Sequence, residues 1–239
     1  MRRPHGGCVK KGGDMRYAMR GVLEKANSFF ELPLNLKSRI LIVVSAVALI
    51  PAFIFPLWNM TFTSNQYTDG LALHIYSHEL QGGKTANRDD LREINSLNHY
   101  IGMRPLLESD FSEFMWLPLA FGALILLSLR AAVIGKMSNL VDVFMLFSYL
   151  GLFSLWSFYH RLYTYGHNLD PTASIKVEPF TPPLFGTKQI ANFSVTSFPD
   201  LGSYALVLFS LLLLSAIVWS RNEVAGDTAV VSTRRAQVA

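Results

Sequence analysis

The chain of 239 residues is 51% hydrophobic and 16% charged, and its formal net charge is +4. Such a charge suits a nucleic-acid partner in a soluble protein, but here most basic residues lie beside the ends of long apolar runs, where they indicate membrane orientation instead. We therefore expect a lipid bilayer and no nucleic acid as a partner. The single cysteine, Cys8, lies close to the start of the chain, which excludes thiol chemistry elsewhere.

Four apolar runs decide the predicted fold class. They cover about residues 40–58, 114–134, 138–159 and 201–219. About 18 or more residues with few charges are long enough to cross the ~30 Å hydrocarbon core of a bilayer as a helix. The sequence therefore predicts an all-α integral membrane protein with four transmembrane helices.

The basic residues also set the expected orientation. Lys and Arg are frequent in segments 1–39 and 220–239 and around the turn after the second run, which share one side of a four-span chain. Because cytoplasmic segments are enriched in Lys and Arg, we expect both termini in the cytoplasm of a bacterium. Loops 59–113 and 160–200 then lie on the periplasmic side of the inner membrane. Tryptophans at the outer ends of three runs agree with this orientation, because Trp is enriched at membrane interfaces: Trp58, Trp116 and Trp156.

The cytoplasmic segment 1–39 contains one patterned stretch. From Met19 to Pro33, apolar residues recur at three- and four-residue spacing, which predicts a short amphipathic helix on the membrane surface. In the first apolar run, Pro51 and Pro56 lie in the outer half. Since proline removes a hydrogen bond from a helix interior, we expect a kink there.

The two periplasmic loops are expected to form a small mixed lid. Residues 71–76 alternate in a β-branched and aromatic context, which predicts a short strand or hairpin. Asp89 and Asp90 precede apolar residues at helical spacing, so a helix should begin there. The loop 160–200 is rich in proline, phenylalanine and isoleucine, and we expect it to be extended chain laid over the first loop.

Histidines supply the candidate metal ligands of the periplasmic side. Imidazole binds copper and thioether sulfur selects Cu(I). Met103 follows His99 by four residues, a spacing that places two side chains on one face if the helix extends that far. The main predicted copper ligands are His99 and His167, and the supplementary ones are Met103, His74 and His78. No established metal motif is present, so each of these residues also fits a structural role.

Other chemistry finds little support in the sequence. Asp142 is the only acid within a predicted span, whereas ion or proton transport usually needs more polar residues at that depth. Serine-hydrolase, P-loop and dinucleotide-binding patterns are missing, so we do not expect an enzyme. A quinol-oxidising or haem-binding subunit needs paired histidines inside spans, and only His160 lies near one.

Four stretches carry a family resemblance: residues 69–71, 93–103, 165–171 and 182–189. The most specific are Asn98-His99-Tyr100 and His167-Asn168-Leu169-Asp170-Pro171. The chain resembles a family of small four-span bacterial membrane proteins encoded in nitrous oxide reductase gene clusters, where one is called the B protein of the cluster. The resemblance implies a setting, which is periplasmic copper-enzyme maturation or its electron supply, more than a reaction.

Two hypotheses about function remain open. In the first, the protein is a membrane accessory protein that holds or presents copper to a periplasmic enzyme through the histidines. In the alternative, it is a structural or docking subunit of a larger membrane complex, without a metal site, and the histidine segments only hold the lid together. Both hypotheses expect another membrane or periplasmic protein as a partner.

Overall fold

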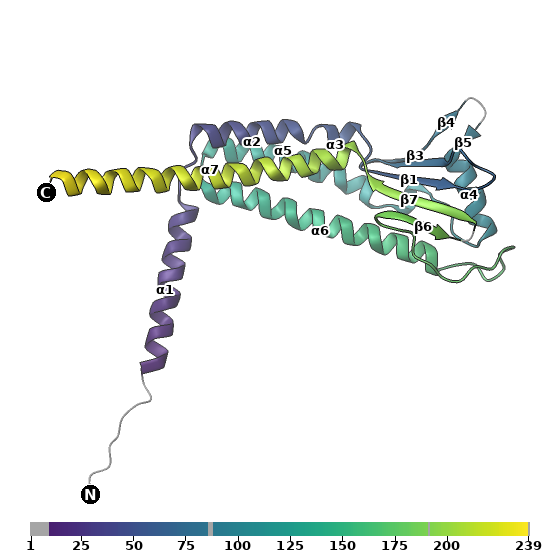
Figure 1. Ribbon diagram of the computed structural model, residues 1–239, viewed down its shortest axis with the longest axis horizontal. Helices are drawn as coiled ribbons and strands as arrows, with labels where there is room; N and C mark the ends of the chain where they lie inside the picture. Colours follow the sequence, from purple (N-terminus) through teal and green to yellow (C-terminus); the bar gives the residue numbers. More distant parts are fainter. Residues whose placement is uncertain (1–9, 86–87, 191, 239) are drawn as a thin grey trace, which may run out of the picture.

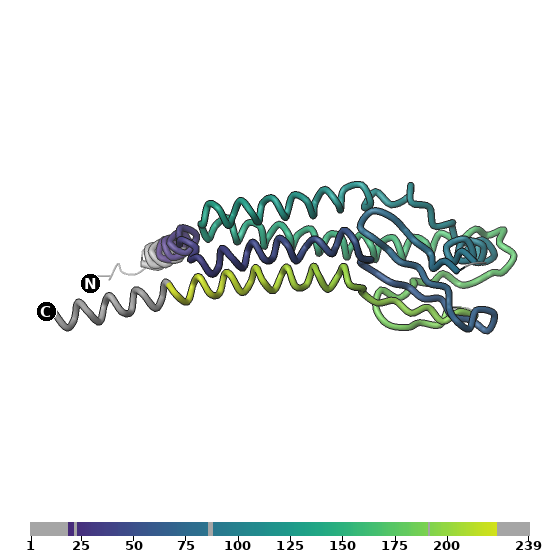
Figure 2. The backbone as a smooth tube through the Cα atoms, turned by 90° about the horizontal axis from the view of Figure 1, so that it is seen from above, coloured from purple at the N-terminus to yellow at the C-terminus, as the bar shows by residue number. Residues whose placement is uncertain are grey.

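The computed structural model describes residues 10–85, 88–190 and 192–238. Long helices form an elongated bundle, a β-sheet with a short helix forms a cap at one end, and α1 (Lys10–Phe30) projects sideways from the other end (Figure 1). Seen from above, bundle and cap follow one another along the same axis (Figure 2). Cys8 and the rest of the expected cytoplasmic segment before Lys10, together with Ala239, lie outside the described residues.

The four apolar runs form the helices of the bundle. These are α2 (Leu36–Ala48) followed by α3 (Pro51–Ile54), then α5 (Glu113–Ile134), α6 (Met137–His167) and α7 (Leu201–Val238). In the described part of the chain, four helical segments are long and apolar enough to cross a membrane: Leu36–Ile54, Glu113–Ile134, Met137–His167 and Leu201–Glu223. The kink predicted from the prolines is confirmed, because α2 ends before Pro51 and α3 begins at it.

The end of the bundle beside the α5–α6 turn is closely packed. Met137, Leu140, Leu213 and Ala216 are fully buried there. The hydroxyl of Ser38 in α2 donates a hydrogen bond to the carbonyl of Ala216 in α7 over 3.0 Å. Apolar contacts and this polar link fix how α2, α6 and α7 meet.

The α5–α6 turn also anchors the chain that follows α1. Gly135 has a left-handed backbone (φ +68°), and a Cβ atom there would overlap the guanidinium group of Arg39. Its carbonyl accepts a hydrogen bond from the Leu34 amide over 2.8 Å, and the Met137 amide donates to the Leu32 carbonyl over 2.9 Å. The left-handed backbone therefore favours glycine at a turn that ties the N-terminal segment to the bundle.

The cap contains a five-stranded antiparallel sheet in the order β3-β2-β1-β7-β6. Its strands are β1 (Trp58–Thr63), β2 (Leu71–Ile75), β3 (Leu80–Gly82), β6 (Gly186–Ile190) and β7 (Phe193–Pro199), and a small separate hairpin is formed by β4 (Lys84–Thr85) and β5 (Arg88–Asp89). A single-turn 3-10 helix, η1 (Glu108–Asp110), precedes α5. The central β1–β7 pair joins the two expected loops, and the Trp58 indole donates a hydrogen bond to the Ser197 hydroxyl over 2.8 Å.

The structure corrects the predicted all-α class, because the cap contains a five-stranded sheet. The expected mixed lid of strands and a helix is confirmed. The predicted strand at residues 71–76 is confirmed as β2, and loop 160–200 does lie against the first loop. However, the predicted first span ends at Trp58, a loop is predicted from residue 59, and residues 193–199 are predicted as extended chain, whereas the structure forms β1 and β7 there. Short strands of this kind are fixed by partners remote in sequence, and Trp58 and Ser197 are 139 positions apart.

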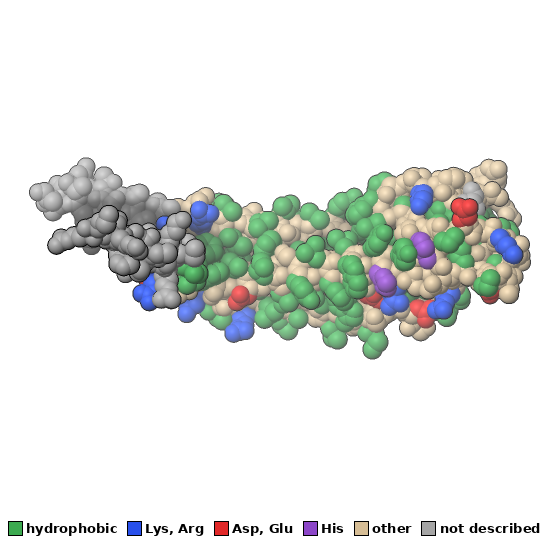
Figure 3. Space-filling model, turned by 90° about the horizontal axis from the view of Figure 1, so that it is seen from below, with side chains coloured by type: hydrophobic (Ala, Val, Ile, Leu, Met, Phe, Trp, Pro, Cys, Tyr) green, Lys and Arg blue, Asp and Glu red, His purple; other side chains and the backbone are tan. Residues whose placement is uncertain are grey.

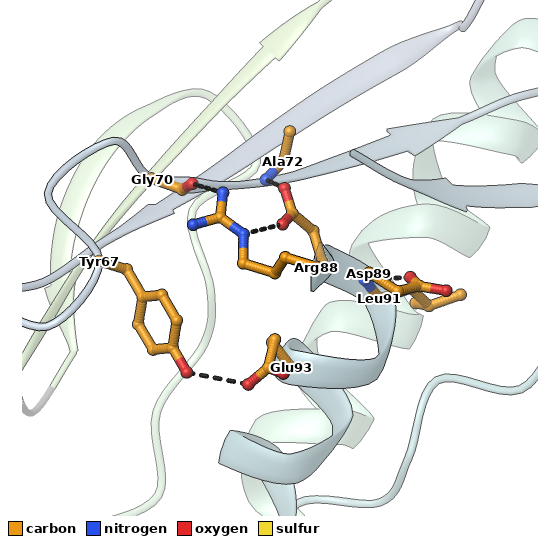
Figure 4. Close-up of polar contacts among 8 residues, drawn as sticks. Tyr67, Gly70, Ala72, Arg88, Asp89, Leu91 and Glu93 are labelled. Atoms are coloured by element: carbon orange, nitrogen blue, oxygen red, sulfur yellow. Dashed lines mark hydrogen bonds and ion pairs between the residues drawn. The ribbon is translucent and has the colours of Figure 1, made fainter. Parts of the chain in front are cut away.

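A polar network fastens α4 (Asp90–Tyr100) to the edge of the sheet (Figure 4). The buried carboxylate of Asp90 accepts hydrogen bonds from the Arg88 side chain over 2.7 Å and from the Ala72 amide over 2.9 Å. Arg88 also donates to the Gly70 carbonyl over 3.1 Å. The helix start predicted at the two aspartates is confirmed, with Asp89 as the residue that caps it.

Candidate functional site

A large apolar cavity lies between the inner face of the sheet and the cap-side halves of the helices. Its volume is about 820 Å³, within the range usual for ligand-binding pockets. The sheet contributes Met60 and Leu73, α4 contributes Leu97, and the bundle contributes side chains as far as Leu124 and Phe147. The cavity therefore runs from inside the cap into the bundle.

The divergence of α6 creates this space. Figure 1 shows α6 and α7 close together at the end away from the cap and separating toward it. Small residues line the gap from both sides, among them Gly151 and Ser154 of α6 and Ser203 and Ser210 of α7. A Cβ atom built at Gly151 meets no other atom within 4 Å. The space is thus left open by small side chains as well as by the helix angle.

An ion pair lies in the otherwise apolar wall. Glu113, the first residue of α5, accepts hydrogen bonds from the Ser157 hydroxyl and from Arg161 of α6, the latter over 3.4 Å. Arg161 also lies over the ring of Phe111, 5.6 Å from its centre. The Glu113 side chain is only 14% exposed. Because partly buried charges are costly to desolvate, the hydrogen bonds from Ser157 and Arg161 compensate for the burial of the Glu113 carboxylate.

A smaller polar pocket of about 250 Å³ adjoins the cavity. The two spaces share Arg161 and Tyr165 as wall residues, and the polar pocket is further lined by Arg104, Asp110 and His160, together with Thr164. The Tyr165 hydroxyl donates a hydrogen bond to Asp110 over 3.4 Å. An apolar chamber and a charged chamber thus meet at one wall.

The two histidine-bearing segments of the family resemblance lie side by side in the cap. The Asp170 amide donates to the Gly102 carbonyl over 2.8 Å, and the Ile175 amide donates to the Tyr100 carbonyl over 2.9 Å. A Cβ atom at Gly102, which has φ +78°, would approach the Asp170 carbonyl oxygen to 2.8 Å. Backbone hydrogen bonds and a close approach that only glycine permits therefore hold these segments together.

His99 lies on the exposed side of this junction. Its ring centre is 6.4 Å from that of Tyr100. The Thr172 hydroxyl and amide both donate to the Asp170 carboxylate, and they hold its pKa below the usual value, with a further contribution from the nearby His99. The acidic neighbour of His99 is thus already engaged in a turn.

His167 occupies a different environment from the one expected. It is the last residue of α6, which continues beyond the predicted end at Tyr159, rather than a residue of a loop turn. Its ring stacks on Tyr163 with centres 3.8 Å apart, and its Nδ1 atom is 2.9 Å from the Tyr163 carbonyl oxygen. The contacts of His167 are therefore with its own helix.

Met103 does not share a helix face with His99. The helix α4 ends at Tyr100, and the left-handed Gly102 redirects the chain, so that Met103 lines the apolar cavity. His78 lies beside Glu79, with its Nε2 atom 3.5 Å from the carboxylate. These two supplementary candidates for metal ligands therefore lie in surroundings that differ from those of His99.

His74 lies on the outer face of the sheet, opposite Asn59 in the β1–β2 register. Among the described residues, His74 Nδ1 and Asn59 Oδ1 are buried polar atoms without a hydrogen-bond partner. Within the described ranges, no three His, Cys, Asp or Glu side chains come together as a group that could hold a metal ion. The copper site stays a prediction, since its five expected ligands have separate neighbours.

Sequence reasoning missed the cavity and its ion pair. The predicted loops 59–113 and 160–200 include Glu113 and Arg161, and hydropathy gives neither residue a role. The available signal was positional, since an acid starts one apolar run and a base follows the end of another. Their pairing, across 48 positions, depends on the α5–α6 hairpin.

Comparisons with protein-family models, curated proteins and solved structures found no match to this chain.

Proposed function

We propose that this chain is an integral protein of the bacterial inner membrane, with the helices of the bundle crossing the bilayer and the cap in the periplasm. On the face shown in Figure 3, hydrophobic side chains cover the middle of the molecule and most charged side chains lie toward its ends. Many large apolar side chains on the helices are exposed, and the exposed fraction is 42–79% for Val43, Leu119, Val133, Leu152 and Val207. Hydrocarbon is the solvent that such a surface requires.

The projecting α1 supports the same orientation. It leaves the bundle at a steep angle to the bundle axis (Figure 1), as a helix lying along the cytoplasmic membrane surface would. Met19, Leu23 and Phe30 are 56%, 60% and 40% exposed, so the helix carries apolar side chains that a lipid surface can cover.

In this setting the protein acts as a non-enzymatic accessory subunit whose cap docks another membrane or periplasmic protein. The β1–β7 pairing carries this proposal, because it builds one sheet from two remote segments directly joined to α3 and α7. In this proposal the two histidine-bearing segments stabilise the cap through backbone hydrogen bonds and ring stacking. The resemblance implies a copper-enzyme or respiratory system as the setting.

Photo-crosslinking in cells tests the docking role. A photoreactive amino acid at Thr196, on the outer face of the sheet, should yield one defined protein adduct. The same group at Leu119, on the apolar surface of α5, serves as the control and should yield lipid adducts. Identical adduct patterns at the two positions would argue against a docking surface on the cap.

Copper binding remains a second candidate, supported by the hydrogen bonds that bring the His99 and His167 segments together. Metal analysis of the purified protein from copper-supplied cells tests it. A His99→Ala/His167→Ala double variant should lose about one copper per chain if the two imidazoles are ligands, while His160→Ala serves as the matched control. If the unmodified protein contains no stoichiometric copper, the docking role is the only candidate that remains.

A further inference from the structure

We infer that the cavity and the adjoining polar pocket form one binding site for a single membrane phospholipid, with its acyl chains in the cavity and its phosphate between Arg104 and Arg161. The inference rests on the proposed membrane insertion for its route of entry. It is independent of whether the cap docks a protein or binds copper.

The cavity is open toward the surface that would face the bilayer. Leu152 and Leu155 of α6 and Val207 and Leu211 of α7 line the cavity and are also 43–70% exposed. The gap between the two helices is therefore a lateral opening with apolar edges. A lipid chain can enter sideways from the bilayer through such an opening without crossing water.

The order of apolar and polar groups along the axis matches that of a phospholipid. The Trp156 ring stacks on His160 with centres 5.6 Å apart, at the level where the polar pocket begins. Aromatic side chains of this kind mark the headgroup region of a membrane. From that level the cavity extends toward Leu124 and Phe147, deeper in the bundle. In this deeper part of the cavity, acyl chains would lie at their usual depth below the phosphate.

The charges of the polar pocket favour a phosphate-bearing head over a neutral one. Arg161 contacts Glu113 through a single nitrogen, Nη2, and a guanidinium group has five N–H donors. Arg104 supplies a second guanidinium group. Asp110 in the same pocket and Glu113 in the adjoining cavity wall offset the two positive charges. This charge pattern suits a zwitterionic headgroup whose phosphate binds the arginines and whose ammonium group binds Asp110. A neutral isoprenoid quinone would use none of this charge pattern.

Two glycines provide a matched test of the cavity. Gly151 lines it, Gly122 of α5 does not, and a Cβ atom at either position meets no other atom within 4 Å. The full chain is purified in mild detergent and examined by native mass spectrometry and lipid extraction. We expect about one retained phospholipid per chain in the unmodified protein and in Gly122→Phe. Retention should fall about tenfold or more in Gly151→Phe, because the ring occupies the space of the chain.

Each other outcome overturns the inference. Equal retention in both glycine variants would mean that the phospholipid sits elsewhere, and a retained quinone would contradict the headgroup assignment. Unchanged retention of phospholipid in Arg104→Gln would show that Arg104 does not bind the phosphate. Resistance of the membrane-bound protein to carbonate extraction is measured in parallel. A chain that resists extraction but retains no lipid would overturn the lipid site and leave membrane insertion standing.

Discussion

The two ends of the bundle are held together by different means. At the α5–α6 turn, fully buried Met137, Leu140 and Leu213 fill the space between the helices. At the cap, the helices surround a cavity of about 820 Å³, and β-sheet hydrogen bonds with a few charged contacts hold the structure around it. The difference shows that close packing at one end can fix the helix arrangement while the other end encloses a cavity.

Shortening a side chain at the packed end should have the largest effect. Leu213→Ala removes a fully buried side chain, and we expect it to lower the free energy of unfolding by about 2–5 kcal/mol. Leu211→Ala, at a 55% exposed position that lines the cavity, should cost under about 1 kcal/mol. Unfolding in mixed micelles, followed by circular dichroism, measures both. Equal losses would mean that the two ends are packed alike.

Breaking the Arg88–Asp90 ion pair should destabilise the cap without loosening the packed end. Arg88→Ala leaves the carboxylate of Asp90, 5% exposed, without its cation, at an expected cost of about 3 kcal/mol. Asp89→Ala removes only the helix cap, at about 1 kcal/mol. Hydrogen exchange resolves where protection is lost. Faster exchange in α7 as well as in β2 would contradict the separation of the two ends.

The Tyr67–Glu93 hydrogen bond should make cap stability depend on alkaline pH. This hydrogen bond is the main cause that raises the pKa of Tyr67 above its usual value. Desolvation and the negative charge of Glu93 raise the pKa further. The folded state therefore holds the phenolic proton more tightly than the unfolded state does. The resulting contribution to folding stability is fully present below about pH 10 and is lost as the pH rises through the raised pKa. Tyr67→Phe should cost about 1 kcal/mol at neutral pH. Its difference from the unmodified protein should shrink above pH 10, and a constant difference would refute this role.

The smallest expected effect lies at Asp170. Thr172→Val removes the hydroxyl donor, so the pKa of Asp170 should rise toward its usual value, which carboxyl NMR can measure directly. The lowered pKa adds stability at neutral pH that is lost as the pH falls through the folded-state pKa. Thr164→Val, whose hydroxyl donates to the His160 carbonyl instead, is the control and should leave the pKa of Asp170 unchanged.

The sequence predicted those features that depend on local patterns. The four apolar helices follow from hydropathy, and α4 follows from Asp89, Asp90 and the apolar spacing after them. The helix break follows from Pro51, because a proline constrains only its own neighbourhood.

The remaining features depend on contacts between remote segments. β1 becomes a central strand only because β7 pairs with it, and nothing within Trp58–Thr63 identifies that partner. The cavity depends on the angle of α6, which the small residue Gly151 permits but does not dictate. The positions of the candidate histidines follow from the expected loops, but the neighbours of their side chains depend on turns such as that at Gly102.

The pairing of β1 with β7 has a consequence for biogenesis. β1 emerges before the second apolar helix is made, whereas β7 directly precedes the last one. Until then β1 lacks one of its two neighbours and exposes backbone groups along an open edge, which is where unwanted strand pairing begins. Closure of the sheet must therefore await nearly the whole chain. A complete cap therefore forms only after residues 186–199, which supply β6 and β7, have been made.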